Sequence, residues 1–516
     1  MKIKFDHIIL GAGIWIIFLL SSCQNDQKKV AKLEEYKPRW ESLSLHNESP
    51  DWFTEAKFGI YFHWGVYSVP AYHNEWYPRW MHFDGHPVNE YHVEHYGDPS
   101  EFSYHDFVPL FSAEKFDAEE WVSLFKNAGA KFAGPVAEHH DGFSMWDSKI
   151  TPWNSMDKGP GRDILGELKK AMNEKNLRLI TTFHHARNLQ RYWGQVNEEM
   201  KKDNIRSRFR NSHYPLFPKA PPADTTDIEF NYIYGNFPEE EWLEEIWLGK
   251  LIEVYEKYEP DIIWFDSWLD RIPEIYRQRF CAGYLNHAEA LGKEVVIVRK
   301  QEDLPLEVSV DDLEKSRKNE IGDKVWMTDE TISRGSWCYT EGLEIKEAKD
   351  VLHVLIDVVS KNGILLLNIS PKADGTIPQN QQEVLLKIGK WLNDNGEAIY
   401  KTQPWYTYGE GPVKEPEGHF KNARQFQNIK YSEKDIRYTC RDNVLYAIFL
   451  GTPEKGSKVL LESFEKGLLP KNFTIDNIKL LENNKELNFQ LKTKGLEVFI
   501  PEELEENMAA VLRIEL

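Results

Sequence analysis

Residues 131–141, Lys-Phe-Ala-Gly-Pro-Val-Ala-Glu-His-His-Asp, carry an apolar run directly into a cluster of polar side chains. This pattern is typical of a buried β-strand that ends at a functional loop. Similar runs that end in polar side chains recur at residues 57–63, 177–185, 260–266 and 294–299. Segments with helical spacing of apolar residues separate them, for example residues 163–176. The alternation predicts a parallel sheet with helical crossovers.

The number of repeats, spread over about 350 residues, favours a (β/α)8-like barrel over a Rossmann sheet. No Gly-x-Gly-x-x-Gly motif follows a strand, which also counts against a dinucleotide fold. Barrels of this class build their sites at the carboxyl ends of the strands. The polar residues at the predicted strand ends are His63, His139, His140, His185, Asp266 and Arg299.

The last part of the chain has a different composition. The 18 tryptophans end at Trp405, and His419 is the single histidine beyond residue 396. Short strand-like runs follow, separated by Gly, Pro, Asn and Asp, which predict an antiparallel β-sandwich. We therefore divide the chain into a catalytic domain at residues 45–400 and a C-terminal sandwich at residues 401–516.

The N-terminus reads as a targeting segment. A basic start with Lys2 and Lys4 precedes the apolar run of residues 8–20, which is too short for a membrane span of about 20 residues. Leu20-Ser21-Ser22-Cys23 resembles the lipobox of bacterial lipoproteins. We expect residues 1–22 to be a signal peptide, residues 23–44 to form a tether and N-terminal segment, and Cys23 to carry a lipid anchor. This predicts an exported bacterial lipoprotein, periplasmic or at the cell surface. An ordinary signal peptide is the alternative.

The charge of the chain limits its partners. The net charge is −20 and the pI about 5.4, which argues against nucleic acid and, more weakly, against polyanionic substrates. Neutral or weakly charged ligands fit best. Beyond Cys23 the chain holds Cys281, Cys338 and Cys440, an odd number without metal-ligand spacing, so a disulfide framework is not expected.

Asp266 is a candidate nucleophile because it follows the apolar run Ile262–Phe265, with the aromatic residues Trp264 and Phe265 directly before it. A carboxylate can attack an anomeric carbon, and such chemistry needs a second, protonated carboxyl nearby. A helix N-cap is the alternative role for Asp266. The candidates for the second carboxyl are Glu302, Asp303, Asp311, Asp312, Glu314 and Glu330. Spacing does not choose among them.

Histidines and tryptophans suit sugar recognition, because imidazoles bond hydroxyls and indole faces stack on sugar rings. A metal site at the pairs His139–His140 and His184–His185 is the competing interpretation. Neighbouring residues on a strand point to opposite faces, which makes such pairs awkward chelators. We therefore predict no metal and no cofactor.

Six ordered motifs resemble the alpha-L-fucosidases of glycoside hydrolase family 29, over roughly residues 45–410. They are residues 57–71 with Glu75-Trp76-Tyr77, residues 138–143 with Trp146-Asp147-Ser148, Trp264-Phe265-Asp266, Ser336-Trp337-Cys338-Tyr339, residues 366–371 with Asp374-Gly375, and residues 395–400. In the fourth motif Cys338 replaces a glycine.

The resemblance implies a retaining exo-glycosidase that acts on fucosylated glycans in two steps, with Asp266 as the nucleophile. It implies that His63, His139, His140 and Trp264 hold the fucose. His185 stands where many members place a tyrosine, and Arg299 lies near a position where some carry an active-site arginine. Three further residues inside the motifs are expected at the substrate: Trp64, Glu75 and Trp337.

The acid/base varies in position within this family. The Trp-Glu-Thr segment of some members reads Trp326-Met327-Thr328 here and lacks the carboxylate. Asp312-Leu313-Glu314-Lys315 resembles the Asp-x-Glu-Arg-Gly segment of others. We therefore assign Glu314, with Glu330 as second choice.

Two other functions remain open. An anchored glycan-binding protein without turnover is one, and a retaining hydrolase for a related sugar such as galactose is the other. The presence of Asp266 with candidate second carboxyls favours an enzyme.

Overall fold

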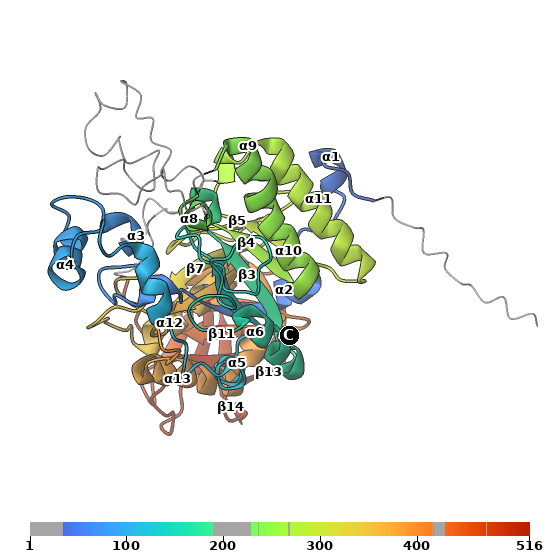
Figure 1. Cartoon of the computed structure of the whole chain (residues 1–516). Helices are drawn as coiled ribbons and strands as arrows, with labels where there is room; N and C mark the ends of the chain where they lie inside the picture. The colour runs from blue at the N-terminus through green and yellow to red at the C-terminus, as the bar shows by residue number, and fades with distance from the viewer. Residues whose placement is uncertain are drawn as a thin grey trace, which may run out of the picture. The chain divides into compact units, whose positions relative to one another are not determined.

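The computed structural model describes residues 35–188, 229–235, 237–266, 269–414, 416, 429–470 and 472–516 (Figure 1). The predicted signal peptide at residues 1–22, the lipidated Cys23 and most of the tether lie outside the described residues. Within the described part of the chain, no helix has the length and apolar character needed to cross a membrane.

Eight parallel strands of the described residues form a closed barrel in sequence order, with β8 pairing back onto β1. The predicted fold class is confirmed. The strands are β1 (Phe58–Phe62), β2 (Phe132–Glu138), β3 (Arg178–Phe183), β4 (Ile262–Phe265), β5 (Val296–Arg299), β6 (Val310–Asp312), β7 (Trp326–Thr331) and β8 (Gly363–Ile369).

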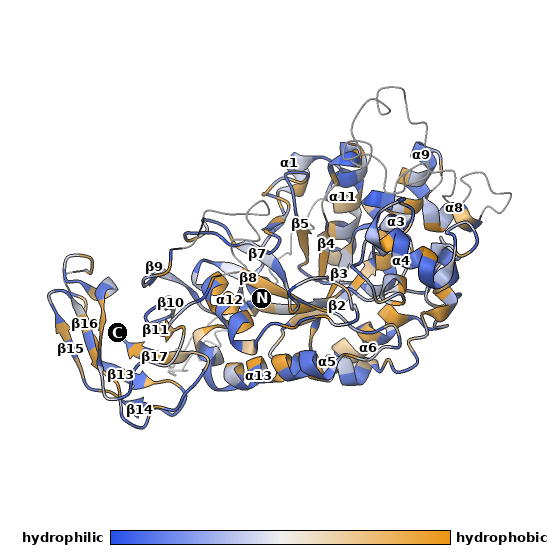
Figure 2. Ribbon diagram, turned by 90° about the vertical axis from the view of Figure 1, so that its left-hand side faces the viewer, coloured by the Kyte–Doolittle hydropathy of each residue, from blue (hydrophilic) through white to orange (hydrophobic). Residues whose placement is uncertain are grey.

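Helices of the crossovers cover the outside of the barrel. The longer ones are α5 (Ala118–Asn127), α6 (Ile164–Lys175), α10 (Gly249–Tyr258), α11 (Glu274–Ala290), α12 (Ala348–Ser360) and α13 (Gln379–Asn395). Figure 2 shows hydrophobic colour along β4 and β5, whereas α5 and α13 alternate between hydrophobic and hydrophilic residues. This contrast is expected, since the strands are buried on both faces and each helix on only one.

Two hydrophobic cores follow from the alternation of side chains along each strand. In β4, Ile262 and Trp264 belong to the core inside the barrel, while Ile263 and Phe265 belong to the core between strands and helices. Continuing the alternation past the end of β4 directs Asp266 toward the inside.

An irregularity in β2 changes which of its side chains face the inside of the barrel. The register with β3 shifts between Val136 and Glu138. Val136 lies in the inner core, but Glu138 bonds Lys250 of α10 outside the barrel, with Nζ 2.8 Å from Oε2. Both side chains are buried. The shift frees His139 to face the mouth of the barrel.

The C-terminal part consists of antiparallel sheets, as predicted. One has the strand order β14-β13-β17-β11-β10-β9 and the other β12-β16-β15. These strands are β9 (Gln403–Glu410), β10 (Ile436–Arg441), β11 (Val444–Phe449), β12 (Lys458–Leu461), β13 (Asn477–Leu480), β14 (Lys485–Glu486), β15 (Phe489–Lys492), β16 (Gly495–Phe499) and β17 (Ala510–Glu515). Side chains of both sheets share one core, so the sheets form a sandwich.

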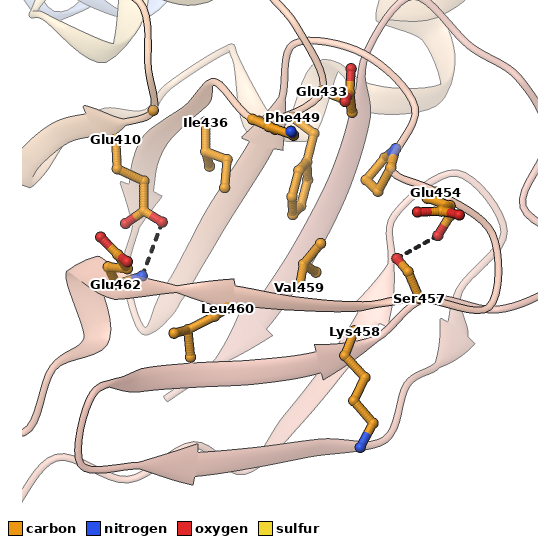
Figure 3. Close-up of a pocket in the computed structure, with 13 residues that line it drawn as sticks. Glu410, Glu433, Ile436, Phe449, Glu454, Ser457, Lys458, Val459, Leu460 and Glu462 are labelled. Atoms are coloured by element: carbon orange, nitrogen blue, oxygen red, sulfur yellow. Dashed lines mark hydrogen bonds between the residues drawn. The ribbon is translucent and has the colours of Figure 1, made fainter.

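A cavity of about 460 Å³ opens in this sandwich, between β12 and the sheet that holds β10 and β11 (Figure 3). Its lining includes Phe449, Val459 and Glu410. The Glu410 carboxylate accepts hydrogen bonds from the backbone N–H groups of Glu462 and Ser463. None of the residues predicted for the site lies in this cavity, so the chemistry has to be sought at the barrel.

Candidate active site

Inward-facing side chains at the ends of several barrel strands meet in one buried cluster. They are His63 after β1, His139 after β2, His184 after β3, Asp266 after β4, Lys300 after β5, Glu314 beyond β6 and Asp329 in β7. We call this set the barrel-end cluster. Its position agrees with the expectation that such barrels place their sites at the carboxyl ends of the strands.

Asp266 lies among positive and imidazole groups. Its Oδ1 is 3.3 Å from Nζ of Lys300, and its Oδ2 is 3.3 Å from Nδ1 of His184 and 3.7 Å from Nε of Arg187. Burial by itself raises the pKa of this carboxyl, but the charges of Lys300 and Arg187 and the hydrogen bond from His184 outweigh it and hold the pKa well below its usual range. Asp266 is therefore ionised at neutral pH, as a nucleophile has to be.

Glu314 reaches the same lysine, with its Oε2 3.0 Å from Nζ of Lys300. Burial raises the pKa of Glu314 above its usual value, and the charges of Asp329 and Asp266 add to that effect while Lys300 opposes it. The two carboxyls thus have pKa values displaced in opposite directions. Such a pair is the usual sign of one acid and one ionised carboxylate with separate roles.

The shared lysine also limits the separation of the two carboxyls. The contacted oxygens of Asp266 and Glu314 are no farther apart than the sum of their two distances to Nζ. Both carboxyls therefore border the same space at the end of the barrel, as a pair that acts on one glycosidic bond has to do.

Three histidines from three strands surround this pair. His63, His139 and His184 each place a ring nitrogen within 4.8 Å of the others. Neighbouring histidines on one strand are awkward chelators, whereas this group brings together single residues from separate strands. Imidazoles of this arrangement could ligate a metal ion. The positive charge of Lys300 opposes a bound cation. Burial is the main cause of the lowered pKa of His63, and the charge of Lys300 adds to it.

His63 has a defined tautomer. Asn368 of β8 donates through its Nδ2 to Thr331 and Trp337, so its Oδ1 is an acceptor. That oxygen lies 2.8 Å from Nδ1 of His63, which therefore carries the proton. Burial lowers the pKa of His63 well below its usual value, so the ring is neutral and its Nε2 is an acceptor. A donor such as a sugar hydroxyl suits this nitrogen.

Aromatic side chains form the walls of the cluster. The ring of Trp264 lies 4.7 Å from Nζ of Lys300, and the ring of Trp337 lies 5.4 Å from that of His63. Glu75 is buried beside them and accepts hydrogen bonds from the backbone N–H of Trp337 and from the hydroxyl of Ser336. His140 follows His139 and packs against the ring of Trp76 at 4.3 Å.

Four predicted site residues lie elsewhere. Trp64 packs between barrel and helices, 4.9 Å from the ring of Trp121. His185 stacks on Trp247 at 6.0 Å and bonds its carbonyl. Arg299 contacts Asp311 and the carbonyl of Leu304. Each follows an inward-facing residue by one position, so its side chain points to the other face of the sheet. Their expected contact with substrate is corrected accordingly.

Glu330, the second choice for the acid/base, is the fourth. It follows the inward-facing Asp329 and pairs with Lys346 at 2.8 Å, on the side of β7 that faces α12 residues His353 and Asp350. It has no contact with Asp266 or Lys300 among the described residues.

Sequence reasoning missed Lys300, His184, Asp329 and Asn368. Lys300 and His184 each stand next to the residue that was chosen, Arg299 and His185. The alternation of β5 assigns Lys300 to the inner face only once the structure shows that Val296 and Val298 face inward, so the sequence alone held no signal for it.

Comparisons with known proteins identify the family of the chain and its fold. A family model described as alpha-L-fucosidase matches residues 22–397, and one described as the alpha-L-fucosidase C-terminal domain matches residues 427–515. Tissue alpha-L-fucosidase of Rattus norvegicus is 31% identical over 97% of this chain and 95% of its own length. The alpha-L-fucosidase of Dictyostelium discoideum is 29% identical over 72% of this chain and 76% of its own.

A solved structure of Thermotoga maritima alpha-fucosidase in complex with fucose is 30% identical. It covers 93% of this chain and 100% of its own, with a TM-score of 0.71. A family match over most of the chain, a relative that is 31% identical along nearly its whole length and a shared barrel lead to one conclusion. The chain belongs to the alpha-L-fucosidase family of glycoside hydrolases.

Proposed function

We propose that this chain is a retaining, exo-acting alpha-L-fucosidase that releases terminal L-fucose from fucosylated glycans by double displacement. Asp266 attacks the anomeric carbon and forms a glycosyl ester, while Glu314 protonates the leaving oxygen. Glu314 then removes a proton from the water that hydrolyses the ester. The observation that carries the proposal is the joint contact of both carboxyls with Lys300.

The charge arrangement supports the change of role that Glu314 has to make. While Asp266 is ionised, its charge helps to keep Glu314 protonated, which suits an acid. Once Asp266 is esterified, that charge is gone and the pKa of Glu314 falls. Lys300 remains in contact with Glu314 and stabilises its ionised form, which suits a base.

The histidines and tryptophans around the carboxyls suit a neutral sugar. Neutral imidazoles of His63 and His184 can bond hydroxyls, and the half-buried ring of Trp337 offers apolar surface. Fucose carries a methyl group where galactose carries a hydroxymethyl group. A galactosidase remains the second candidate among enzymes.

Turnover of 4-nitrophenyl α-L-fucoside tests the proposal, with the matching α-D-galactoside as the alternative substrate. NMR of the first product should show α-fucose before mutarotation, because retention follows from two displacements. First formation of the β-anomer would contradict retention. Binding of the fucoside without hydrolysis would favour the glycan-binding alternative.

We also propose that the mature protein is lipidated at Cys23 and held at a membrane surface of a bacterial envelope. The support is the basic start, the apolar run and the Leu-Ser-Ser-Cys sequence. Detergent partitioning of the native protein and of Cys23→Ser tests it. The native form should enter the detergent phase and the variant the aqueous phase. Equal partitioning would contradict the anchor.

A further inference from the structure

A buried aspartate that the proposed mechanism does not use lies beside the barrel-end cluster. Asp312 is the last residue of β6, two positions after Val310, whose side chain belongs to the core inside the barrel. The alternation of the strand therefore directs Asp312 inward as well. Its side chain is in hydrogen-bonding contact with that of Asp329 on the neighbouring strand β7. Two carboxyls thus meet inside the barrel, where neither is reached by solvent.

The two carboxyls differ in the donors that reach them. Oδ2 of Asp329 lies 3.2 Å from Nζ of Lys300 and accepts a hydrogen bond from the hydroxyl of Tyr61 at 2.9 Å. Within the described part of the chain, no group donates to Oδ1 of Asp329 or to either oxygen of Asp312. Buried polar atoms in folded proteins nearly always have a partner. A proton on Asp312 supplies the missing one, because a carboxylic acid can donate to Oδ1 of Asp329.

The charges around Asp312 favour the same position of the proton. The titratable groups that face it are Asp329 in β7, Glu314 beyond β6, Lys300 after β5 and Tyr61 in β1. Burial and the charge of Asp329 raise the pKa of Asp312 well above its usual value, and the charge of Lys300 does not offset them. Asp329 is the ionised partner, since an ammonium and a hydroxyl both reach its other oxygen.

From these contacts we propose that Asp312 is a positioning residue, which keeps its proton at neutral pH and donates a hydrogen bond to Asp329. Asp329, held on both oxygens, fixes the Lys300 ammonium at the two proposed catalytic carboxyls. The proton on Asp312 also keeps a further negative charge away from Glu314, which has to be ionised in the second step of the reaction. The proposal rests on the fucosidase activity proposed above and adds a residue that acts through Lys300.

Stability against urea tests the proton on Asp312 without any substrate. An aspartate that keeps its proton in the folded state and loses it in the unfolded chain above about pH 4 makes the protein less stable as the pH rises. Asp312→Asn has no proton to lose, so the variant lacks this part of the slope. The urea midpoint of the variant relative to that of the parent should therefore rise between about pH 5 and about pH 8. A constant difference over this range would show that Asp312 is ionised in the folded state and would overturn the proposal.

The pH profile of kcat/KM tests the positioning. Asp312→Leu has nearly the same shape as the parent but no donor, so Asp329 and Lys300 are held less firmly. We expect kcat/KM to fall about tenfold and both limbs of the profile to move to higher pH, since Lys300 then stabilises the two ionised carboxyls less well. Asp312→Asn keeps a donor and should recover most of the rate and return both limbs toward the parent's positions.

The matched control is the same change one position earlier. The side chain of Asp311 is half-buried and contacts Arg299, so Asp311→Leu should leave both limbs in place. Limbs that stay in place in Asp312→Leu, or an Asp312→Asn variant as impaired as Asp312→Leu, would contradict the positioning role. If the parent hydrolyses no fucoside, the proposed function has failed, and the urea comparison still decides whether Asp312 holds its proton.

Discussion

The Nζ atom of Lys300 lies 3.0 Å from Oε2 of Glu314. The same ammonium also contacts Asp266 and Asp329, and all four side chains are largely shielded from solvent. One buried cation thus favours the ionised form of both proposed catalytic carboxyls, although burial outweighs it at Glu314. Most of the following predictions test this arrangement.

Removing the Asp266 carboxylate should abolish turnover. Asp266→Gly eliminates the group that forms the glycosyl ester, so kcat should fall by about a thousandfold or more. Added azide should restore part of the rate by attacking the anomeric carbon from the vacated side. Full activity without azide would show that another residue is the nucleophile.

Glu314→Ala should slow hydrolysis of a natural fucoside by about a hundredfold or more. The loss should be smaller for an aryl fucoside, whose leaving group needs less protonation. Azide should rescue the variant and give a fucosyl azide of retained configuration. Glu330→Ala is the matched comparison: it leaves Lys346 without its partner and should lower the Tm without azide rescue. Rescue in Glu330→Ala alone would reverse the assignment.

The pH profile of kcat/KM should have two limbs. Asp266 has to be ionised, and its pKa is held well below the usual range, so the acid limb should lie below that of an ordinary carboxyl. Glu314 has to be protonated and its pKa is raised, so activity should fall as the pH rises through that higher value.

Lys300→Met should move both limbs of that profile to higher pH, because a positive charge beside each carboxyl is lost. We also expect kcat to fall about tenfold or more. Lys300→Arg keeps the charge and should return both limbs toward their original positions. A profile that does not move in Lys300→Met would contradict electrostatic control by this lysine.

Glu138→Gln should destabilise the fold. The substitution keeps the shape of the side chain but leaves the ammonium of Lys250, which is fully buried, without its counter-charge. Breaking such a pair costs about 3–5 kcal/mol of unfolding free energy. Glu244→Gln is the control, since its ion pair with Arg279 is exposed and worth less than about 1 kcal/mol. Urea unfolding of the two variants measures the difference.

A buried histidine should make stability depend on pH. Burial lowers the pKa of His353 to about 4, while its imidazole bonds the carbonyl of Met508. In the unfolded chain this histidine takes up its proton near pH 6.5. Between these two pH values the unfolded state binds more protons than the folded state, so a lower pH favours unfolding. The stability that neutral His353 contributes is therefore lost as the pH falls from about 6.5 toward 4. His353→Gln should flatten unfolding free energy against pH over this window, and an unchanged slope would contradict the assignment.

The sequence was sufficient for the barrel and for most of the strand ends, because apolar runs and helical spacing alternate clearly along the chain. It predicted Asp266 and His63 at strand ends, and both directly follow barrel strands. From the sequence we expected Arg299 and His185 at the substrate, whereas the side chains that reach Asp266 are those of Lys300 and His184. The reason is physical: strands of a parallel barrel are apolar on both faces, so their sequence contains no polar marker of which side is inside.

Partners contributed by distant strands were also beyond a reading of the sequence. Nothing in the run Ile364–Ile369 indicates that Asn368 fixes the tautomer of His63, because that contact depends on pairing between β8 and β1. The outward position of Glu330 likewise depends on which residues of β7 face the inside of the barrel, and this is known only from the structure. Local composition suggested carboxyls of the right type, and the family resemblance favoured Glu314 among them. The contact of Glu314 with Lys300 depends on the closed barrel and could not be read from the sequence.

The bond between His63 and Asn368 joins the first strand of the barrel to the last. The backbone N–H of His63 also donates to Asn368 Oδ1, at 3.0 Å. The residues of this seam are 305 positions apart in the chain. A growing polypeptide therefore has no complete sugar pocket until residue 368 has been synthesised and the two end strands have paired. Enzymatic activity should appear together with ring closure during refolding, which makes hydrolysis of a fucoside a direct reporter of that last step.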